Sequence, residues 1–115
     1  MDASDFRNRS PRFQGSNLDT NLALVERIRS IATELGASVA QVAIAWVQAQ
    51  GSDIVPLVGA RRRDRLAEAL GALEVSLTPA HLAVLAKAIP VGAAAGGRYP
   101  EAQLAHLDSE KRTQA

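Results

Sequence analysis

Four arginines and one aspartate occupy five consecutive positions in the stretch GARRRDRL, which runs from Gly59 to Leu66. The stretch follows SDIVPLV, which predicts a short buried strand, so the positive charge gathers where that strand ends. Guanidinium groups bind phosphate in bidentate fashion, and they also solvate helix surfaces and contact nucleic acid. The residue types alone therefore leave three explanations: a solvated helix face, a nucleic-acid contact, or a phosphate-bearing cofactor.

The glycine before the arginines and the helix expected after them favour a phosphate. Gly59 has no Cβ, so a ligand can approach its backbone closely. The first N–H groups of a helix are unsatisfied and lie at the positive end of its dipole, where anions bind. Arginine is unfavourable at that end, so Arg61, Arg62 and Arg63 are better explained by a bound phosphate than by solvation alone.

Bulk composition excludes several classes of protein. The isoelectric point of about 8.3 is too mild to indicate a nucleic-acid protein by charge alone. The absence of cysteine excludes disulfides, thiolate zinc sites and a cysteine nucleophile. No run approaches the roughly 18 apolar residues of a membrane span, and the first residues lack the apolar core of a secretory signal. We therefore expect a soluble, cytoplasmic chain that binds neither nucleic acid nor membrane.

Periodicity and end signals predict a mostly helical chain with one clear strand. Residues 1–16 predict a loop or disordered lead-in, 17–107 the folded part and 108–115 a polar tail. Gly36 is expected to end the first helix, Ser38 with Gln41 to open the second as a capping box, and Thr78 with Pro79 to open the fourth. The predicted helices cover 17–35, 39–50, the residues after the arginines to about 73, 80–89 and 100–107, and the strand covers 53–58.

One predicted strand among several predicted helices indicates that other strands lie outside this sequence. A single buried strand leaves its backbone N–H and C=O groups without partners. The helix from Val39 to Val47 is apolar on nearly every side, which is typical of a helix buried on more than one face, and Trp46 on it is expected in the core. We therefore expect the chain to be part of a larger α/β protein whose other strands lie outside it.

Several blocks in order carry a family resemblance: PRFQGSNLDTNLALVERI, SVAQVAIAWVQAQGSDIVPLVGARRRDRLAEALGAL, SLTPAHL and GGRYPEAQL. Together they resemble the C-terminal part of aldo-keto reductases, over Asp5 to Leu107. The resemblance implies the C-terminal portion of a (β/α)8 TIM barrel that uses NADP(H), with 53–58 as the eighth strand. It also implies that the remainder of the barrel is needed for a closed fold.

The resemblance further implies which residues hold the cofactor's phosphates. Gly59 and Ala60 would lie against the phosphates, and Arg61 would meet the adenosine 2′-phosphate. Arg62 is a weaker candidate, and Arg63 is expected to face solvent. Ala60 departs from the family pattern, in which a hydroxyl residue is common.

The same resemblance assigns the adenine. Arg65 would stack on the adenine or share the 2′-phosphate, and Glu68 would accept a hydrogen bond from the adenine amino group. Ala69 stands where the family usually has an adenine-binding Asn, which puts adenine recognition in question.

The family chemistry implied is hydride transfer from the nicotinamide to a small aldehyde or ketone. In the family, a catalytic tetrad of Asp, Tyr, Lys and His lies in the first half of the barrel, and its motifs are absent from this sequence. We therefore expect no catalytic residue in the chain, no metal site, and no activity from the chain alone. Tyr99 is expected to pack or to contact a rim, His81 and His106 to be surface or capping residues, and Lys87 to suit a helix end.

Two other classes of function stay open. IATELGASVAQVAIAWV has the helix–Gly–helix cadence of a helix-turn-helix DNA-binding module, although Gln41 is the main polar side chain that its second helix offers to bases. Alternatively, the chain is a noncatalytic product of a shortened gene, with an exposed apolar helix that recruits a partner.

Overall fold

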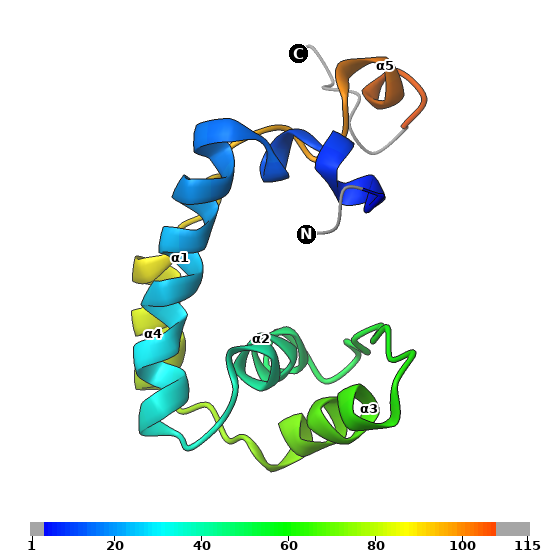
Figure 1. The fold of residues 1–115 in the computed structure, drawn as a ribbon. Coiled ribbons are helices and arrows are strands. Elements are labelled where there is room, and N and C mark those ends of the chain that lie inside the picture. The colour runs from blue at the N-terminus through cyan, green and yellow to red at the C-terminus, as the bar shows by residue number, and fades with distance from the viewer. Residues whose placement is uncertain (1–3, 108–115) are drawn as a thin grey trace. The chain divides into compact units, whose positions relative to one another are not determined.

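The computed structural model describes residues 4–107, and all regular structure in that range is helical (Figure 1). The chain divides into two compact units. Within the described range, unit 1 contains residues 4–23 and 92–107, and unit 2 contains residues 24–91. The elements in chain order are η1 (Phe6–Arg9), η2 (Pro11–Phe13), α1 (Gly15–Glu34), α2 (Val39–Gln48), α3 (Arg63–Leu70), η3 (Gly71–Glu74), α4 (Pro79–Ala88) and α5 (Glu101–Leu104). The polar tail 108–115 lies outside the described residues.

Gly36 ends α1 as the sequence predicts. Its φ of +62° is a left-handed conformation that residues with a Cβ rarely adopt. The Ala37 N–H donates to the Ala32 carbonyl at 2.8 Å, and the Gly36 N–H donates to the Thr33 carbonyl at 3.1 Å. These two bonds form a Schellman motif, which satisfies carbonyls that the helix end would otherwise leave free.

The predicted capping box at Ser38 and the predicted helix start at Thr78 and Pro79 are both confirmed. The Ser38 hydroxyl accepts from the Gln41 N–H at 3.2 Å, and the Gln41 side chain accepts from the Ser38 N–H at 2.9 Å. At α4 the Thr78 hydroxyl accepts from the His81 N–H, and the His81 Nδ1 atom accepts from the Thr78 N–H, each at 3.2 Å. His81 is therefore a capping residue, as expected. Pro79 sits in the first turn, where its missing N–H costs nothing.

A small apolar core holds unit 2 together. Ile31, Ala32, Val42 and Leu85 are at most 6% exposed and bring α1, α2 and α4 into contact. In Figure 1, α4 runs beside α1, and the Arg27 Nη1 atom on α1 donates to an α4 carbonyl at 3.0 Å. On the other side, α2 packs against α3 and η3. Few side chains are buried in this core, so much apolar surface remains exposed.

The predicted strand at 53–58 does not form. Ser52 and Asp53 form a turn, and from residue 54 the segment has no regular structure. Val55 is 80% exposed and Leu57 is 99% exposed, so the apolar side chains that suggested a buried strand face outward. A strand needs a neighbour to pair its backbone groups, and no other described segment of this chain supplies one.

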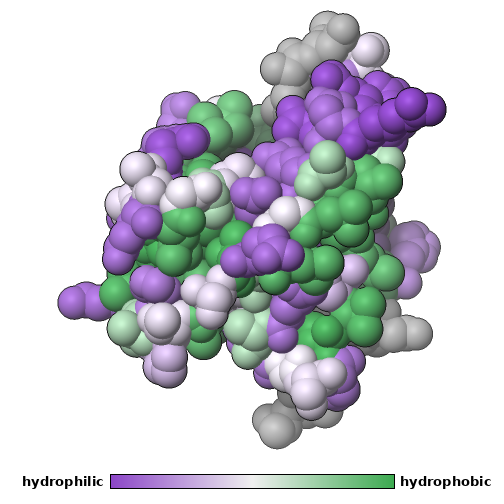
Figure 2. All heavy atoms as spheres, turned by 90° about the horizontal axis from the view of Figure 1, so that it is seen from below, coloured by the Kyte–Doolittle hydropathy of each residue, from purple (hydrophilic) through white to green (hydrophobic). Residues whose placement is uncertain are grey.

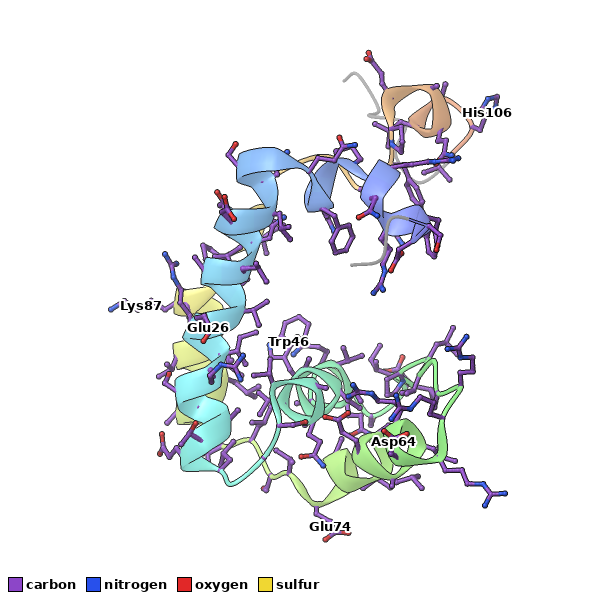
Figure 3. The ribbon with its side chains drawn as sticks, in the orientation of Figure 1. Glu26, Trp46, Asp64, Glu74, Lys87 and His106 are labelled. Carbon is purple, nitrogen blue, oxygen red and sulfur yellow. The ribbon has the colours of Figure 1, made fainter. Side chains whose placement is uncertain are left out.

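The prediction that Trp46 lies in the core is also wrong. Val42 and Ala45 are the buried residues of α2, whereas Trp46 is 41% exposed and projects from the side of α2 opposite α3 (Figure 3). Apolar and polar residues alternate over the face drawn in Figure 2, where apolar areas reach the surface. The all-apolar pattern of α2 predicts burial on several sides, but the described residues cover only part of its circumference.

Unit 1 is held by asparagine side chains rather than by a core. The Asn21 amide donates to the Ala95 carbonyl at 2.9 Å and accepts from the Ala95 N–H at 2.8 Å. The Asn17 amide donates to the Pro11 carbonyl at 3.0 Å. These bonds join the start of α1 to η2 and to the segment before α5.

Within residues 4–107, no single helix is long and apolar enough to cross a membrane. The helices α1 and α2 meet the criteria of length and composition only as a pair, and that pair is bent by 88°.

Candidate cofactor-binding site

The arginine run, Arg61 to Arg65, follows the segment 53–60 and extends into the first turn of α3. Gly59 and Ala60 have no regular structure, Arg62 is the N-cap residue of α3, and the helix begins at Arg63. The Arg62 side chain makes no capping hydrogen bond. The first turn of α3 therefore lacks the serine or threonine oxygen that closes α2 and α4.

A carboxylate lies in this first turn instead. Asp64 accepts from the Arg62 Nε atom at 2.9 Å and from its Nη2 atom at 2.7 Å. The Arg62 hydrogen bonds lower the pKa of Asp64, with further contributions from the N–H groups of Asp64 and Arg65. Asp64 occupies the first turn of α3, where the sequence predicts affinity for a phosphate (Figure 3).

A second ion pair involves the residues assigned to the adenine. The Arg65 Nη1 atom lies 2.8 Å from the Glu68 Oε2 atom. The pKa of Glu68 is lowered, first by this bond and then by a hydrogen bond from Ser38, and the pKa of Arg65 is raised by its bond to Glu68. The Gln41 Nε2 atom donates to the Glu68 carbonyl at 3.0 Å. Glu68 is thus tied to both Arg65 and the start of α2.

Two arginines of the run differ from the paired ones. Arg61 and Arg63 are exposed, and neither has an ion-pair or hydrogen-bond partner on its side chain among the described residues. At Gly59 a Cβ atom would meet nothing within 4 Å, so the backbone there is open to an approaching group. The site therefore combines an open backbone with unpaired guanidinium groups.

Neither carboxylate pair of this site is among the predictions from the sequence. Glu68 follows Arg65 by three positions on a helix, a spacing at which opposite charges commonly meet, so the signal was present. Asp64 lies within the arginine run, but the sequence predicts no role for it. The contact of Gln41 with Glu68 joins residues 27 positions apart, and no local pattern indicates it.

The other candidate residues lie apart from this site in the sequence, and none forms a metal cluster. The Arg98 guanidinium carbon lies 5.5 Å from the centre of the Tyr99 ring. Lys87 is in the last turn of α4, where it suits the helix dipole. Within residues 4–107, no three His, Asp or Glu side chains come together in a way that could hold a metal ion.

The structure argues against the helix-turn-helix alternative, because the side chain expected to contact bases, Gln41, is already engaged. Gln41 is half-buried, and both ends of its amide are engaged, one with Ser38 and the other with Glu68. A side chain with both ends engaged does not present a free amide to base edges.

Comparison with protein families matches residues 2–90 to the aldo/keto reductase family. Among curated proteins, the chain is 45% identical over 89 residues to probable aldo-keto reductase 1 of Glycine max, covering 77% of this chain and 26% of that protein. It is 41% identical over 96 residues to aldo-keto reductase yakc of Schizosaccharomyces pombe, whose name specifies NADP(+), covering 84% of this chain and 28% of that protein.

The chain thus spans about a quarter of the length of these curated relatives. No solved structure matches it significantly. The family match covers well over half of the chain and includes the whole arginine run. This chain belongs to the aldo/keto reductase family.

Proposed function

We propose that residues 59–68 hold the adenosine-phosphate end of NADP(H) in an oxidoreductase that reduces aldehydes or ketones by hydride transfer. Membership of the aldo/keto reductase family supports the reaction class, and the name of the Schizosaccharomyces pombe relative supports the cofactor. The observation that carries the proposal is the exposed Arg61, whose side chain has no partner among the described residues, two residues after an open Gly59.

The residues fit a phosphate at Gly59 and Arg61. A phosphate can approach the Gly59 backbone because no atom occupies the space a Cβ would take. No carboxylate among the described residues pairs with the Arg61 guanidinium. Arg61 can therefore bind the 2′-phosphate without first breaking an ion pair. Ala60 offers its backbone to the phosphates.

Arg62 and Arg65 are secondary contacts in this proposal. Each is paired with a carboxylate, Asp64 and Glu68 respectively, so each would have to share its guanidinium between carboxylate and phosphate. Glu68 keeps its expected role toward the adenine amino group only if one of its oxygens stays free of Arg65. The Arg65–Glu68 bond engages a single nitrogen and a single oxygen, but Ser38 also donates a hydrogen bond to this carboxylate, so the adenine amino group would share the Glu68 acceptor with Arg65 and Ser38.

When bound, NADP(H) supplies the hydride for a carbonyl carbon. In this proposal the chain's residues hold and orient the cofactor, and the proton donor and most of the substrate pocket belong to a part of the barrel outside this sequence. The exposed apolar side chains at Val55 and Leu57 suit a segment that pairs with those further strands. The chain alone is then expected to bind nucleotide without turning it over.

Calorimetric titration of the 115-residue chain with adenosine 2′,5′-bisphosphate and with adenosine 5′-monophosphate tests the proposal. The bisphosphate is expected to bind at least about tenfold more tightly, because one charge-assisted contact to the 2′-phosphate separates the two ligands. This preference should fall as salt rises.

Arg61→Gln is expected to abolish the preference for the bisphosphate, and Arg63→Gln should keep it. The two substitutions remove the same charge from exposed arginines that both lack a partner in the described part of the chain. Equal affinity of the wild-type chain for the two nucleotides, or an unchanged preference in Arg61→Gln, would show that the site is wrongly assigned.

A further inference from the structure

Unit 1 contains a cavity of about 380 Å³ that no residue of the arginine run lines. One wall comes from η1 and η2, and the other from the residues just before and within α5. Three aromatic side chains line the cavity: Phe6, Phe13 and Tyr99. Phe6 is 81% exposed, and Phe13 and Tyr99 are each more than a third exposed, so these aromatic surfaces remain available to a ligand. The volume falls within the usual range for small-molecule sites.

The cavity also carries positive charge that no described carboxylate neutralises. Arg9 and Arg98 line it, and within residues 4–107 neither guanidinium has an ion-pair partner. Arg7 lines it too but is bonded through both Nε and Nη2 to Asp5, which offsets its charge. Arg98 lies over the Tyr99 ring, which holds a cation beside an aromatic face.

Close contacts link the two walls before any ligand arrives. Gly96 has a φ of +81°, and a Cβ there would lie 2.8 Å from the carbonyl carbon and oxygen of Pro11. The Arg12 Nε atom donates to the Gly96 carbonyl at 3.5 Å, and Asn21 bonds both the Arg12 carbonyl and the Ala95 backbone. The segment that carries Arg98 and Tyr99 is thus fastened to the segment that carries Arg9 and Phe13.

We propose that this cavity binds a small aromatic carboxylate. An aromatic ring matches the apolar lining and can stack on Phe13 or Tyr99, and a carboxylate matches the unpaired guanidinium groups of Arg9 and Arg98. A neutral aromatic molecule would bury part of these guanidinium groups without giving them a negatively charged acceptor, so it should bind more weakly. The proposal goes beyond the cofactor role and does not depend on it, since the two sites share no residue.

Fluorine NMR of the ligand tests this site on the full chain. The probe is 4-(trifluoromethyl)benzoate, and the matched neutral probe is 4-(trifluoromethyl)benzyl alcohol. The benzoate signal should broaden and shift on addition of the chain, with an affinity at least about tenfold higher than that of the alcohol. Arg98→Gln and, separately, Arg9→Gln should each weaken benzoate binding severalfold and leave the alcohol unaffected.

Arg63→Gln is the control for lost charge, because Arg63 is exposed, equally without a partner in the described range, and outside the cavity. Far-ultraviolet circular dichroism checks that each variant keeps its helices, and Arg9→Gln covers the case in which Arg98→Gln does not fold. The proposal is overturned if the wild-type chain does not bind the benzoate at millimolar concentration, if the alcohol binds equally well, or if both cavity variants bind like Arg63→Gln.

Discussion

The Arg65 Nη1 atom lies 2.8 Å from the Glu68 Oε2 atom, one turn further along α3. The family resemblance assigns both side chains to the adenosine of the cofactor, one as a cation for the ring or 2′-phosphate and the other as an acceptor. Before any nucleotide arrives, the two satisfy each other. Arg61, which has no such partner in the described part of the chain, is therefore the arginine best placed to make the first contact with a phosphate.

Arg65→Gln is expected to raise the pKa of Glu68 toward its ordinary value of 4.5, because the Arg65 hydrogen bond is the main cause of its lowered pKa. Carboxyl chemical shifts followed by NMR titration measure the change. Arg63→Gln is the control, since Arg63 makes no bond to Glu68. An unchanged Glu68 titration in Arg65→Gln would mean that the pair does not persist in solution.

Asp5 should titrate near pH 2 in the wild-type chain. Hydrogen bonds from the Arg7 side chain and backbone lower its pKa from an ordinary value of 3.8 to about 2. Because the folded pKa is the lower one, the stabilisation is complete above about pH 4 and is lost as the pH falls through 2. Arg7→Gln should move the NMR midpoint of Asp5 back toward 3.8, and a wild-type midpoint already at 3.8 would contradict the pairing.

Thr78→Ala is expected to lower the free energy of unfolding by about 1 kcal/mol, because it removes the oxygen that caps α4. Thr33→Ala is the matched control: its hydroxyl donates to the Arg29 carbonyl inside α1, and alanine is the better helix former there. Urea unfolding followed by circular dichroism compares the two. Equal effects would show that the Thr78 cap contributes nothing measurable.

Gly96→Ala should loosen unit 1 far more than Gly92→Ala. The two glycines have nearly the same φ, 81° and 82°, so alanine carries a similar conformational cost at each, about 1–2 kcal/mol. Only at Gly96 would the new Cβ also collide with the Pro11 backbone.

The Ala95 N–H, which donates to Asn21, reports on the segment next to Gly96. Its hydrogen exchange should be much faster in Gly96→Ala than in Gly92→Ala. Gly96→Ala should also bind 4-(trifluoromethyl)benzoate more weakly than Gly92→Ala. Similar exchange in the two variants would mean that the contact between Gly96 and Pro11 does not hold unit 1.

Local signals in the sequence predict the helices well, because their causes are local. Ser38, Thr78 and Gly36 act within four residues of themselves, and each does in the structure what its type predicts. The first helix begins at Gly15, two residues before its predicted start at 17, and the third is followed by a short 3-10 helix, η3. Such shifts at helix ends are ordinary.

Long-range features were predicted poorly. Apolar residues at 53–58 predict a buried strand, and the pattern of α2 predicts burial of Trp46, but both predictions depend on neighbours that the described chain does not contain. The hydrogen bonds of the asparagine side chains in unit 1 join residues up to 74 positions apart, and no local sequence pattern predicts them. In the candidate site, the arginine run and the family resemblance indicate the arginines and Glu68, whereas the ion pairs Arg62–Asp64 and Arg65–Glu68 are not among the predictions.

The most direct test of the central claim is the phosphorus NMR signal of the 2′-phosphate of NADP(+) titrated with pH in the presence of the chain. If Arg61 binds this group, its second pKa, near 6 when free, should fall on binding, because a guanidinium favours the dianion. The fall should be lost in Arg61→Gln and kept in Arg63→Gln. A 2′-phosphate that titrates in the presence of the wild-type chain as it does in free NADP(+) would contradict the account.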